Sequence, residues 1–328
     1  MTAPAERPPV WFERAIVPEL AAEVAAAVTI LGPSTPADPY SGLAAARAAV
    51  ASTMRYDAAL MDCAPGLRLI ARTGIGYDLV DVVEATRRGI AVCNTPDAPT
   101  ISTAEHAVTL MLMVAKGVKR AESRLRQGSG DYYAHQKAIE LRGKVLGLVG
   151  CGRIARHVAA ICGAMGMRVT AHDPFLAQAD LPPGVDLVAT LEQLLRIADV
   201  VSVHVPLSDA TRHLFGAAQF RWMKPGAVFV NTARGGLVDS DALLAALAAG
   251  HLFGAGLDVT EPEPLPIGHP LLGRDDVVVT PHVASATADA KVRIFRAAFE
   301  QVVDGLAGRR PGHLVNPEVW ATATSAGG

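Results

Sequence analysis

Cysteine is scarce in this sequence, and the spacing of its cysteines excludes two common architectures. The four cysteines are Cys63, Cys93, Cys151 and Cys162. They form no C-x-x-C pair, and no spacing matches a zinc site or a disulfide framework. We therefore expect no metal site, and we interpret the cysteines as free thiols in a reducing cytoplasm.

The sequence also lacks an excess of charge of one sign and a long hydrophobic run. Its 30 Lys and Arg residues nearly balance 32 Asp and Glu residues, so no strong field would attract nucleic acid or an anionic membrane. The most apolar segment, AVTLMLMVA at 107–115, is short and is soon followed by Lys116, Lys119 and Arg120, which indicates a buried helix. The N-terminal segment carries acidic residues and prolines and makes a poor signal peptide. We expect a cytoplasmic protein that binds neither nucleic acid nor membranes.

Apolar runs alternate with Ala- and Leu-rich helical stretches along the 328 residues. This alternation is typical of parallel strands joined by crossover helices, and the length suffices for two domains. In the first hundred residues we predict helices over 18–28 and 80–89, the second ending at Gly89. The predicted strands there lie near 9–13, 27–31, 48–51, 67–71 and 90–93.

A second α/β series follows a long helix that is predicted to run from Thr100 through 102–125, with Ser102 or Thr103 as a candidate N-cap. The last helix, over 289–308, is predicted to return to the first unit, which places the domain boundaries near Pro99 and Thr287. The predicted strands of the second series are 145–150, 167–173, 199–205, 227–231, 254–259 and 277–282.

A glycine-rich turn joins the first strand of the second series to the next helix. Gly150, Gly152 and Ala155 spell G-x-G-x-x-A. The first glycine permits a tight turn, the second lets a pyrophosphate approach the backbone, and the third position needs only a small side chain. Phosphate would lie against free N–H groups at the helix start. A packing turn in an unrelated α/β protein would carry the same motif, so the motif needs support from its context.

Asp173 provides that context, because it ends the next strand 23 residues after Gly150. An acidic residue at about this distance is expected to bind the ribose hydroxyls of a dinucleotide. Pro174 and Phe175 follow, and no adjacent arginine could receive a 2′-phosphate, so NAD is favoured over NADP. The alternative is that Asp173 only caps a helix.

Three later segments place charged side chains at predicted strand ends. They contribute Arg234, Asp258, Glu261, Glu263 and His282. Ligands of open parallel sheets bind beyond the carboxyl ends of the strands. A histidine with a carboxylate partner can act as general acid or base, and an arginine can grip a carboxylate. Taken singly, each residue has a simpler interpretation as a turn or surface residue; taken together they indicate hydride transfer.

An ordered set of motifs resembles the NAD-dependent D-2-hydroxyacid dehydrogenases, the family that includes phosphoglycerate dehydrogenase and glyoxylate/hydroxypyruvate reductase. The resemblance is close over 67–287 and looser elsewhere. The motifs are RTGIGYDLVD, GKVLGLVGCGRIARHVA, HVPLSDATRHL, VNTARGGLVDSDAL, GAGLDVTEPEP and TPHVASAT.

The resemblance implies a catalytic set of Arg234, Glu263 and His282. Arg234 would bind the substrate carboxylate and polarise the 2-oxo group, and His282 would donate or remove the proton at the substrate oxygen. Glu263 would orient the ring of His282; Glu261 also precedes a proline, but its spacing from Arg234 fits less well. The backbone N–H groups of Gly74, Ile75 and Gly76 would hold the substrate carboxylate. The expected cofactor residues are Gly150, Gly152, Arg153, Ile154, Asp173, His204, Val205, Pro206, Thr232, Ala233, Asp258 and Ala284.

The expected fold class is α/β, with two Rossmann-like doubly wound domains of parallel strands and a cleft between them. Residues 1–99 plus 288–328 would form a flavodoxin-like substrate-binding domain, and 100–287 the NAD-binding Rossmann domain. The resemblance also implies a homodimer with the long helix from Ser102 at its interface, although that apolar helix could equally be internal core.

Two departures from the family pattern bear on the substrate. Ala284 and Ser285 stand where the family often has a glycine pair, and Ala51 stands where phosphoglycerate-oxidising members carry an arginine, with Arg55 offset by four. Phosphoglycerate dehydrogenase proper therefore remains an alternative, as does an NAD-sensing corepressor that binds partner peptides. The remaining histidines are interpreted as structural, because they lack paired carboxylates at helpful spacing in the sequence: His106, His135, His157, His172, His213, His251, His269 and His313.

Overall fold

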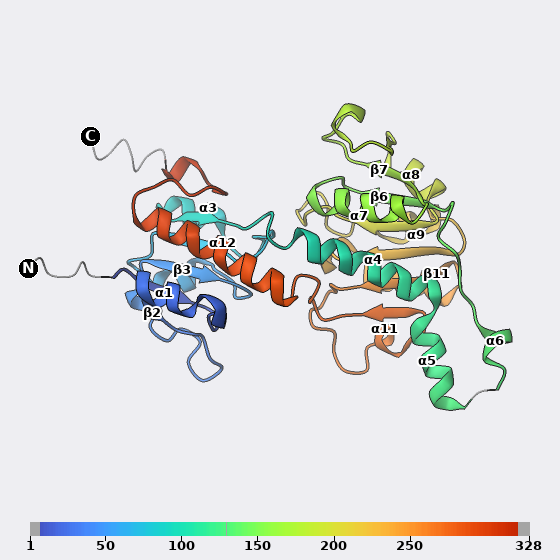
Figure 1. The fold of residues 1–328 in the computed structure, drawn as a ribbon, viewed down its shortest axis with the longest axis horizontal. Helices are drawn as coiled ribbons and strands as arrows, with labels where there is room; N and C mark the ends of the chain where they lie inside the picture. Colours follow the sequence, from blue (N-terminus) through green and yellow to red (C-terminus); the bar gives the residue numbers. More distant parts are fainter. Residues whose placement is uncertain (1–6, 129, 321–328) are drawn as a thin grey trace, which may run out of the picture. The chain divides into compact units, whose positions relative to one another are not determined.

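The structure is a computed structural model of the chain and describes residues 7–128 and 130–320. The chain forms two compact units (Figure 1). One unit combines the residues up to Pro99 with those from Thr287 on, and the other is Thr100–Ala286. Both are built from parallel strands with helices on the two faces of the sheet, so the predicted α/β class is confirmed.

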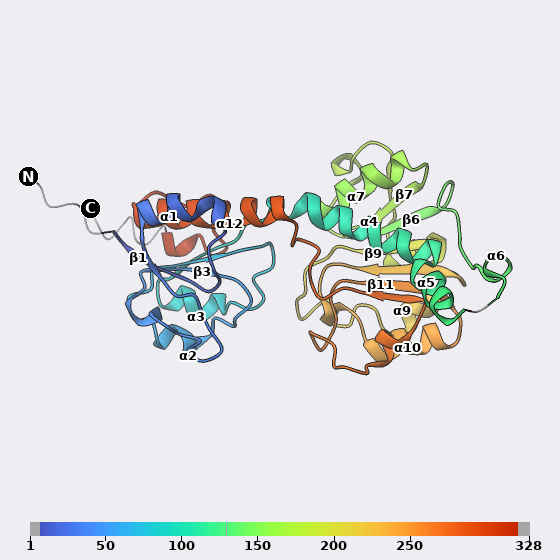
Figure 2. The ribbon, with the colours of Figure 1, turned by 60° about the horizontal axis from the view of Figure 1, so that its bottom comes forward.

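The first unit has a five-stranded sheet in the order β2-β1-β3-β4-β5, and its strands pair in parallel. Helices α1 and α12 cover one face of this sheet, and α2 and α3 cover the other (Figure 2). The strands are β1 (Pro9–Phe12), β2 (Thr29–Leu31), β3 (Ala48–Ala51), β4 (Leu69–Arg72) and β5 (Ala91–Cys93). The helices are η1 (Pro18–Leu20), α1 (Ala21–Ala27), η2 (Leu43–Ala45), α2 (Ala58–Asp62), α3 (Val82–Arg87) and α12 (Ala288–Leu306).

The second unit has a seven-stranded parallel sheet in the order β12-β11-β10-β9-β6-β7-β8. Helices α4 and α7 pack on one face, and α8, α9 and α10 pack on the other. The strands are β6 (Val145–Val149), β7 (Arg168–His172), β8 (Val185–Leu187), β9 (Val200–Val203), β10 (Ala227–Asn231), β11 (Leu252–Leu257) and β12 (Val277–Val279). The helices are α4 (Thr100–Lys116), α5 (Val118–Gln127), α6 (Tyr132–His135), α7 (Arg153–Ala164), η3 (Gln178–Asp180), α8 (Leu191–Ile197), α9 (Ala217–Trp222), η4 (Gly235–Leu237), α10 (Ser240–Ala248) and α11 (Pro270–Gly273).

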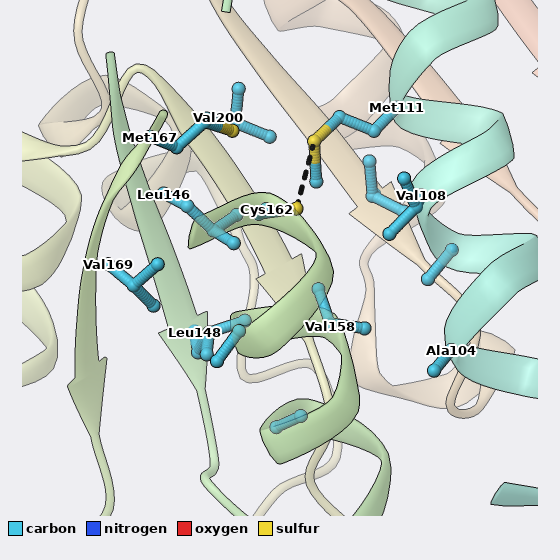
Figure 3. Packing of buried hydrophobic residues seen from close by; sticks show 14 of the residues in the cluster. Ala104, Val108, Met111, Leu146, Leu148, Val158, Cys162, Met167, Val169 and Val200 are labelled. Carbon is cyan, nitrogen blue, oxygen red and sulfur yellow. Dashed lines mark hydrogen bonds between the residues drawn. The ribbon is translucent and has the colours of Figure 1, made fainter. Parts of the chain in front are cut away.

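The core between α4, α7 and β6 supports the glycine turn. Leu146 and Leu148 of β6 point at α7, and Cys162 of α7 faces Met111 of α4 with 4.0 Å between the sulfur atoms (Figure 3). These four side chains have no exposed area. Since α7 begins at the turn, this packing fixes the direction in which its N-terminus points.

The apolar segment 107–115 lies inside this core, as predicted. Ala107, Leu110 and Met111 of α4 are completely buried. A Cβ at Gly256 of β11 would lie 2.8 Å from Leu110 Cβ, so the glycine lets the helix approach the sheet closely. Among the described residues, no helix is long and apolar enough to span a membrane.

Three local predictions were wrong. The long helix breaks at Gly117, which has φ 61° and whose Cβ would lie 2.8 Å from the carbonyl oxygen of Lys137. Helix α4 begins at Thr100, so Ser102 and Thr103 lie within its first turn and are not its N-cap. Strand β8 was missed, because its three residues include an exposed aspartate and offer no apolar run.

Replacing Leu146 by alanine should destabilise the second unit. The side chain is fully buried under α7, and the cavity left behind should cost about 2–5 kcal/mol of unfolding free energy. Urea unfolding followed by circular dichroism measures the change. Leu272→Ala makes the same chemical change at a side chain that is 40% exposed, and an equal loss in both variants would contradict the described core.

Candidate active site

The turn between β6 and α7 can be formed only with glycine at its first position. Gly150 has φ 85°, and a Cβ there would lie 2.8 Å from Val205 Cγ1 and 2.9 Å from the carbonyl oxygen of His204. A side chain would therefore be both strained and blocked. The close contact places the turn directly beside the segment that follows β9.

The second and third positions of the motif meet the needs of a phosphate. Gly152 is the N-cap of α7, and a Cβ built on it meets no heavy atom within 4 Å. Ala155 is completely buried where the helix meets the sheet. The N–H groups at the start of α7 therefore face a space that no side chain of the motif fills, which is suited to an anion.

Asp173 lies at the rim of the same turn. Its Oδ2 accepts a hydrogen bond from the N–H of Cys151 at 3.0 Å, and its Oδ1 accepts one from Phe175 at 3.0 Å. The next helix starts only at Gln178, so Asp173 does not act as a helix cap. Its carboxylate stands beside the turn, where the ribose of a dinucleotide would lie.

The segments after β9 and β10 supply further residues expected at a cofactor. Thr232 is buried, and its Oγ1 has no hydrogen-bond partner among the described residues. A buried hydroxyl without a partner costs free energy, which a bound polar group would relieve. The remaining expected residues lie on the same strand ends or open α7; they are Arg153, Ile154, Val205, Pro206 and Ala233.

His204 is held as a neutral ring in this region. Its Nε2 lies 2.9 Å from the hydroxyl of Ser202, and burial lowers the pKa of His204 to about 4. The imidazole is therefore uncharged at neutral pH.

His282 and Glu263 form a close pair. Nδ1 of His282 lies 2.6 Å from Oε1 of Glu263, and both side chains are a little over one-third exposed. His282 has φ 54°, a rare conformation for a residue with a Cβ. Its backbone N–H donates to the carbonyl oxygen of Asp258 at 2.7 Å, which holds the residue in this conformation.

Asp258 lies beneath this pair, and its side chain has no exposed area. Its carboxylate accepts hydrogen bonds from the hydroxyl of Thr280 at 2.6 Å and from the N–H groups of Val283 and Ala284, both at 2.9 Å. Burial acts to raise the pKa of Asp258, but these bonds and His106 outweigh it and lower the pKa. In this arrangement the carboxylate holds the 282–284 segment, and its contact with a cofactor stays a prediction.

The neighbouring glutamate has other partners. Nη1 of Arg212 contacts the two carboxylate oxygens of Glu261 at 3.0 and 3.1 Å, and Nε2 of His213 lies 3.3 Å from one of them. Of the two glutamates that precede a proline, it is therefore Glu263 that contacts His282.

Three of the remaining histidines lie near carboxylates that their spacing in the sequence did not indicate. His106 lies 3.4 Å from Asp258, His213 contacts Glu261, and His313 lies 3.7 Å from Asp97. Partners in the first two pairs are 152 and 48 residues apart in the sequence. No local signal could therefore have revealed these pairs, or the hydrogen bond between His106 and Thr280.

Arg234 follows β10, and Glu263 follows β11, the strand beside β10 in the sheet. The side-chain amide of Asn231 donates to the carbonyl oxygen of Arg234 at 2.8 Å, and Nη1 of Arg234 donates to the carbonyl oxygen of Ala233 at 2.7 Å. A Cβ on Gly235 would overlap the carbonyl of Thr260. Glycine at that position therefore brings the backbone beside Arg234 against the segment that leads to Glu263.

The predicted substrate loop belongs to the other unit. The N–H of Gly74 donates to Thr95 Oγ1 at 2.8 Å, and the side chain of Asn94 donates to the carbonyl oxygen of Ile75 at 2.7 Å. The N–H of Gly74 is therefore already engaged, and its contact with a substrate carboxylate stays a prediction. Among the described residues, the N–H groups of Ile75 and Gly76 have no hydrogen-bond partner.

In the part of the chain that the structure describes, no group of three or more His, Cys, Asp or Glu side chains could hold a metal ion. The site is instead defined by a dinucleotide-type turn and a histidine–carboxylate pair within one α/β unit. These features define the class of nicotinamide-dependent dehydrogenases.

Comparison with known proteins identifies the family. Residues 108–284 match the family model for the NAD-binding domain of D-isomer specific 2-hydroxyacid dehydrogenases. The chain is 42% identical to the glyoxylate reductase of Aeropyrum pernix over 274 residues, which cover 81% of this chain and 82% of that protein. The chain therefore belongs to the D-isomer specific 2-hydroxyacid dehydrogenase family, enzymes that act on CH–OH donors with a nicotinamide cofactor.

Two further relatives bear on the substrate and the cofactor. The D-3-phosphoglycerate dehydrogenase of Archaeoglobus fulgidus is 41% identical over 268 residues, 81% of this chain but only 50% of that protein. The D-lactate dehydrogenase of Aquifex aeolicus, solved with NAD and lactic acid, superposes with a TM-score of 0.82 at 28% identity, covering 94% of this chain and 98% of that one. The predicted nicotinamide cofactor is thus confirmed.

The low pKa of His204 should make the protein less stable in acid. Between its ordinary pKa of 6.5 and the value of about 4 in the folded state, the unfolded chain binds a proton that the folded chain does not. The free energy of unfolding should therefore fall by up to about 3 kcal/mol as the pH drops through this interval. Urea unfolding at pH 7 and pH 4.5 should show a smaller loss in His204→Gln than in the wild type.

His251→Gln is the matched control, because it removes a partly buried histidine whose ring also makes a hydrogen bond, to the carbonyl oxygen of Met223. If both variants lose as much stability in acid as the wild type, burial of His204 does not contribute to the pH dependence.

Proposed function

We propose that the protein is an NAD-dependent oxidoreductase that transfers a hydride between nicotinamide C4 and C2 of a D-2-hydroxy acid or 2-oxo acid. The observation that carries the proposal is the 2.6 Å contact between His282 and Glu263, in the unit that also holds the G-x-G-x-x-A turn. A histidine with a carboxylate partner supplies the proton that must accompany hydride transfer.

Each catalytic group has a defined task in this proposal. Glu263 accepts a hydrogen bond from Nδ1–H of His282, which leaves Nε2 of the partly exposed ring to carry the proton exchanged with substrate. In reduction that proton goes to the oxygen bound to C2; in oxidation the neutral ring removes it. The guanidinium of Arg234 binds the substrate carboxylate and polarises the 2-oxo group. The bound cofactor supplies or accepts the hydride.

Residues at the turn support a preference for NAD over NADP. The carboxylate of Asp173 is fixed by two backbone N–H groups beside the turn. In that position it can accept hydrogen bonds from ribose hydroxyls, and its charge repels a 2′-phosphate. Pro174 and the 92% exposed Phe175 follow, and neither can neutralise that charge.

The first unit favours a small unphosphorylated acid over 3-phosphoglycerate. The N–H groups of Ser52, Thr53 and Met54, which follow β3, all donate to the carboxylate of Glu13. These donors are therefore occupied by an anion rather than available to a phosphate. Arg55 is exposed, and among the described residues it makes no ion pair. Glyoxylate and hydroxypyruvate are the substrates we propose, in keeping with the 42% identity to a glyoxylate reductase.

We further propose a cytoplasmic homodimer. All four cysteines are free thiols, and three of them are buried, which suits a reducing compartment. The apolar face of α4 is internal core and so cannot form the interface. Helices α5 and α6 extend from the far end of α4 (Figures 1 and 2) and expose Leu125 and Tyr133, at 65% and 95%. We propose that these two helices bind the second copy; α5 covers the end of the helix predicted at the interface, and α6 lies beyond it.

Replacing His282 by alanine should reduce turnover by about 10²–10⁴-fold, because the proton donor is lost. Binding of NADH should persist, since the turn and Asp173 are untouched. The measurements are NADH oxidation with a panel of 2-oxo acids and fluorescence titration with NADH. His157→Ala, at an exposed histidine of α7, should match the wild type; near-normal activity in His282→Ala would reject the acid–base role.

The same assay separates enzyme from corepressor. A wild-type protein that binds NADH and a partner peptide but reduces none of the 2-oxo acids would support the corepressor alternative instead.

Replacing Asp173 by alanine should weaken discrimination between the two cofactors. The ratio of kcat/KM for NADH to that for NADPH should fall about tenfold or more, since a carboxylate that repels the 2′-phosphate and binds ribose is removed. Asp186→Ala makes the same change at the exposed aspartate of β8 and should leave the ratio unchanged. An unaltered ratio in Asp173→Ala would contradict the proposed basis of NAD preference.

A further inference from the structure

The turn formed by Thr260–Glu263 makes ionic contacts on two sides. Glu263 contacts the ring of His282 at 2.6 Å. On the other side, Nη1 of Arg212 contacts the two carboxylate oxygens of Glu261 at 3.0 and 3.1 Å, and Nε2 of His213 lies 3.3 Å from Oε2 of Glu261. One short segment thus carries both the carboxylate of the proposed acid–base pair and a second carboxylate that contacts an arginine and a histidine.

The backbone of this turn is packed so closely that its position affects several site residues. Gly235, directly after Arg234, leaves no room for a Cβ beside the carbonyl of Thr260. The hydroxyl of Ser240 donates to the carbonyl oxygen of Glu261 at 3.3 Å, and that of Thr260 donates to the carbonyl oxygen of Pro262 at 2.8 Å. A shift of the turn would therefore move Glu263 relative to both His282 and the backbone beside Arg234.

The conformation of His213 supports a role beyond surface packing. His213 and His282 are the two non-glycine residues with positive φ among the described residues, at 52° and 54°. Such a conformation costs energy and persists where neighbouring contacts impose it. The N–H of His213 donates to the carbonyl oxygen of Gly236 at 2.8 Å, so the backbone of His213 is joined to the Arg234–Gly236 segment while its ring contacts Glu261.

We infer that Arg212, His213 and Glu261 form a positioning clamp that keeps the Thr260–Glu263 turn in place and Glu263 on the ring of His282. The inference rests on the proposed function in assigning His282 its acid–base role. Arg212 and Glu261 are 50% and 41% exposed, and exposed ion pairs contribute little to global stability. We therefore assign this pair to the alignment of Glu263 with His282 rather than to global stability.

The charged and titratable groups around His282 in this network come from several segments. Glu263 contacts the ring, Asp258 and His106 lie beneath the 280–284 segment, and the clamp lies on the outer side of the turn. Arg234 follows the neighbouring strand. Glu261→Gln removes one charge from the clamp and leaves all of the other groups in place.

The test measures how easily the ring of His282 is protonated. In protein with isotope-labelled histidine, NMR titration should show the midpoint of His282 in Glu261→Gln lowered by about half a pH unit, because a less well held Glu263 favours the protonated ring less. In 2-oxo acid reduction, kcat should fall about threefold with KM for NADH unchanged. The fall in activity toward high pH should also begin at a lower pH in Glu261→Gln than in the wild type.

Further variants separate positioning from general stability. Arg212→Ala should repeat the effect of Glu261→Gln, and Arg212→Lys should restore most of the wild-type behaviour. Glu192→Gln breaks the exposed pair with Arg196 on α8 and should change nothing. An unchanged His282 midpoint in Glu261→Gln would overturn the clamp, whether or not thermal stability or kcat also fell.

The NMR result does not depend on turnover, so the two proposals can fail separately. If the midpoint shifts as expected but the wild type reduces no 2-oxo acid, the clamp holds and the proposed function is wrong. If the wild type is active but the midpoint stays, the function holds and the clamp is wrong.

Discussion

The parallel order of the strands is the constraint on which the candidate site depends. β9, β10, β11 and β12 are successive neighbours in the second sheet and run in the same direction, and β6 lies on the other side of β9. Their carboxyl ends therefore meet at one edge. The segments that leave this edge carry the glycine turn, Arg234, Glu263 and His282, although the chain between the turn and His282 spans most of the unit. Backbone hydrogen bonds of the sheet thus bring these groups into one region before any side-chain contact is made.

A buried carboxylate completes the arrangement. A charge removed from water is costly unless it is paired or hydrogen-bonded, and Asp258 satisfies this requirement with the hydroxyl of Thr280 and the N–H groups of Val283 and Ala284. The same bonds hold the segment that presents His282. Stability and function are therefore linked here: the contacts that make burial of Asp258 possible also orient the exposed His282–Glu263 pair.

Much of the fold could be predicted from apolar periodicity, because strands buried on both faces appear as short apolar runs between amphipathic helices. The predicted strands of the first unit agree with the observed ones to within two residues at every end. The failures at Gly117 and β8 share one cause: a contact with another segment of the chain decides the local structure. The chain around Gly117 has a helical pattern, yet the carbonyl of Lys137 approaches that glycine from a distant loop, and β8 is a strand only because β7 offers a pairing edge.

The sequence by itself determined which chemical groups are available: a G-x-G-x-x-A turn, an acidic residue at the end of the next strand, and an arginine, glutamates and a histidine after later strands. Only the tertiary structure decided which of them meet. It placed Glu261 on Arg212, turned Asp258 into the interior, engaged the N–H of Gly74 with Thr95, and joined His106 to Thr280 across 174 residues. The physical reason is that a hydrogen bond is sensitive to differences in distance of a few tenths of an ångström. Packing sets these distances between segments, and the separation of the segments along the chain does not predict them.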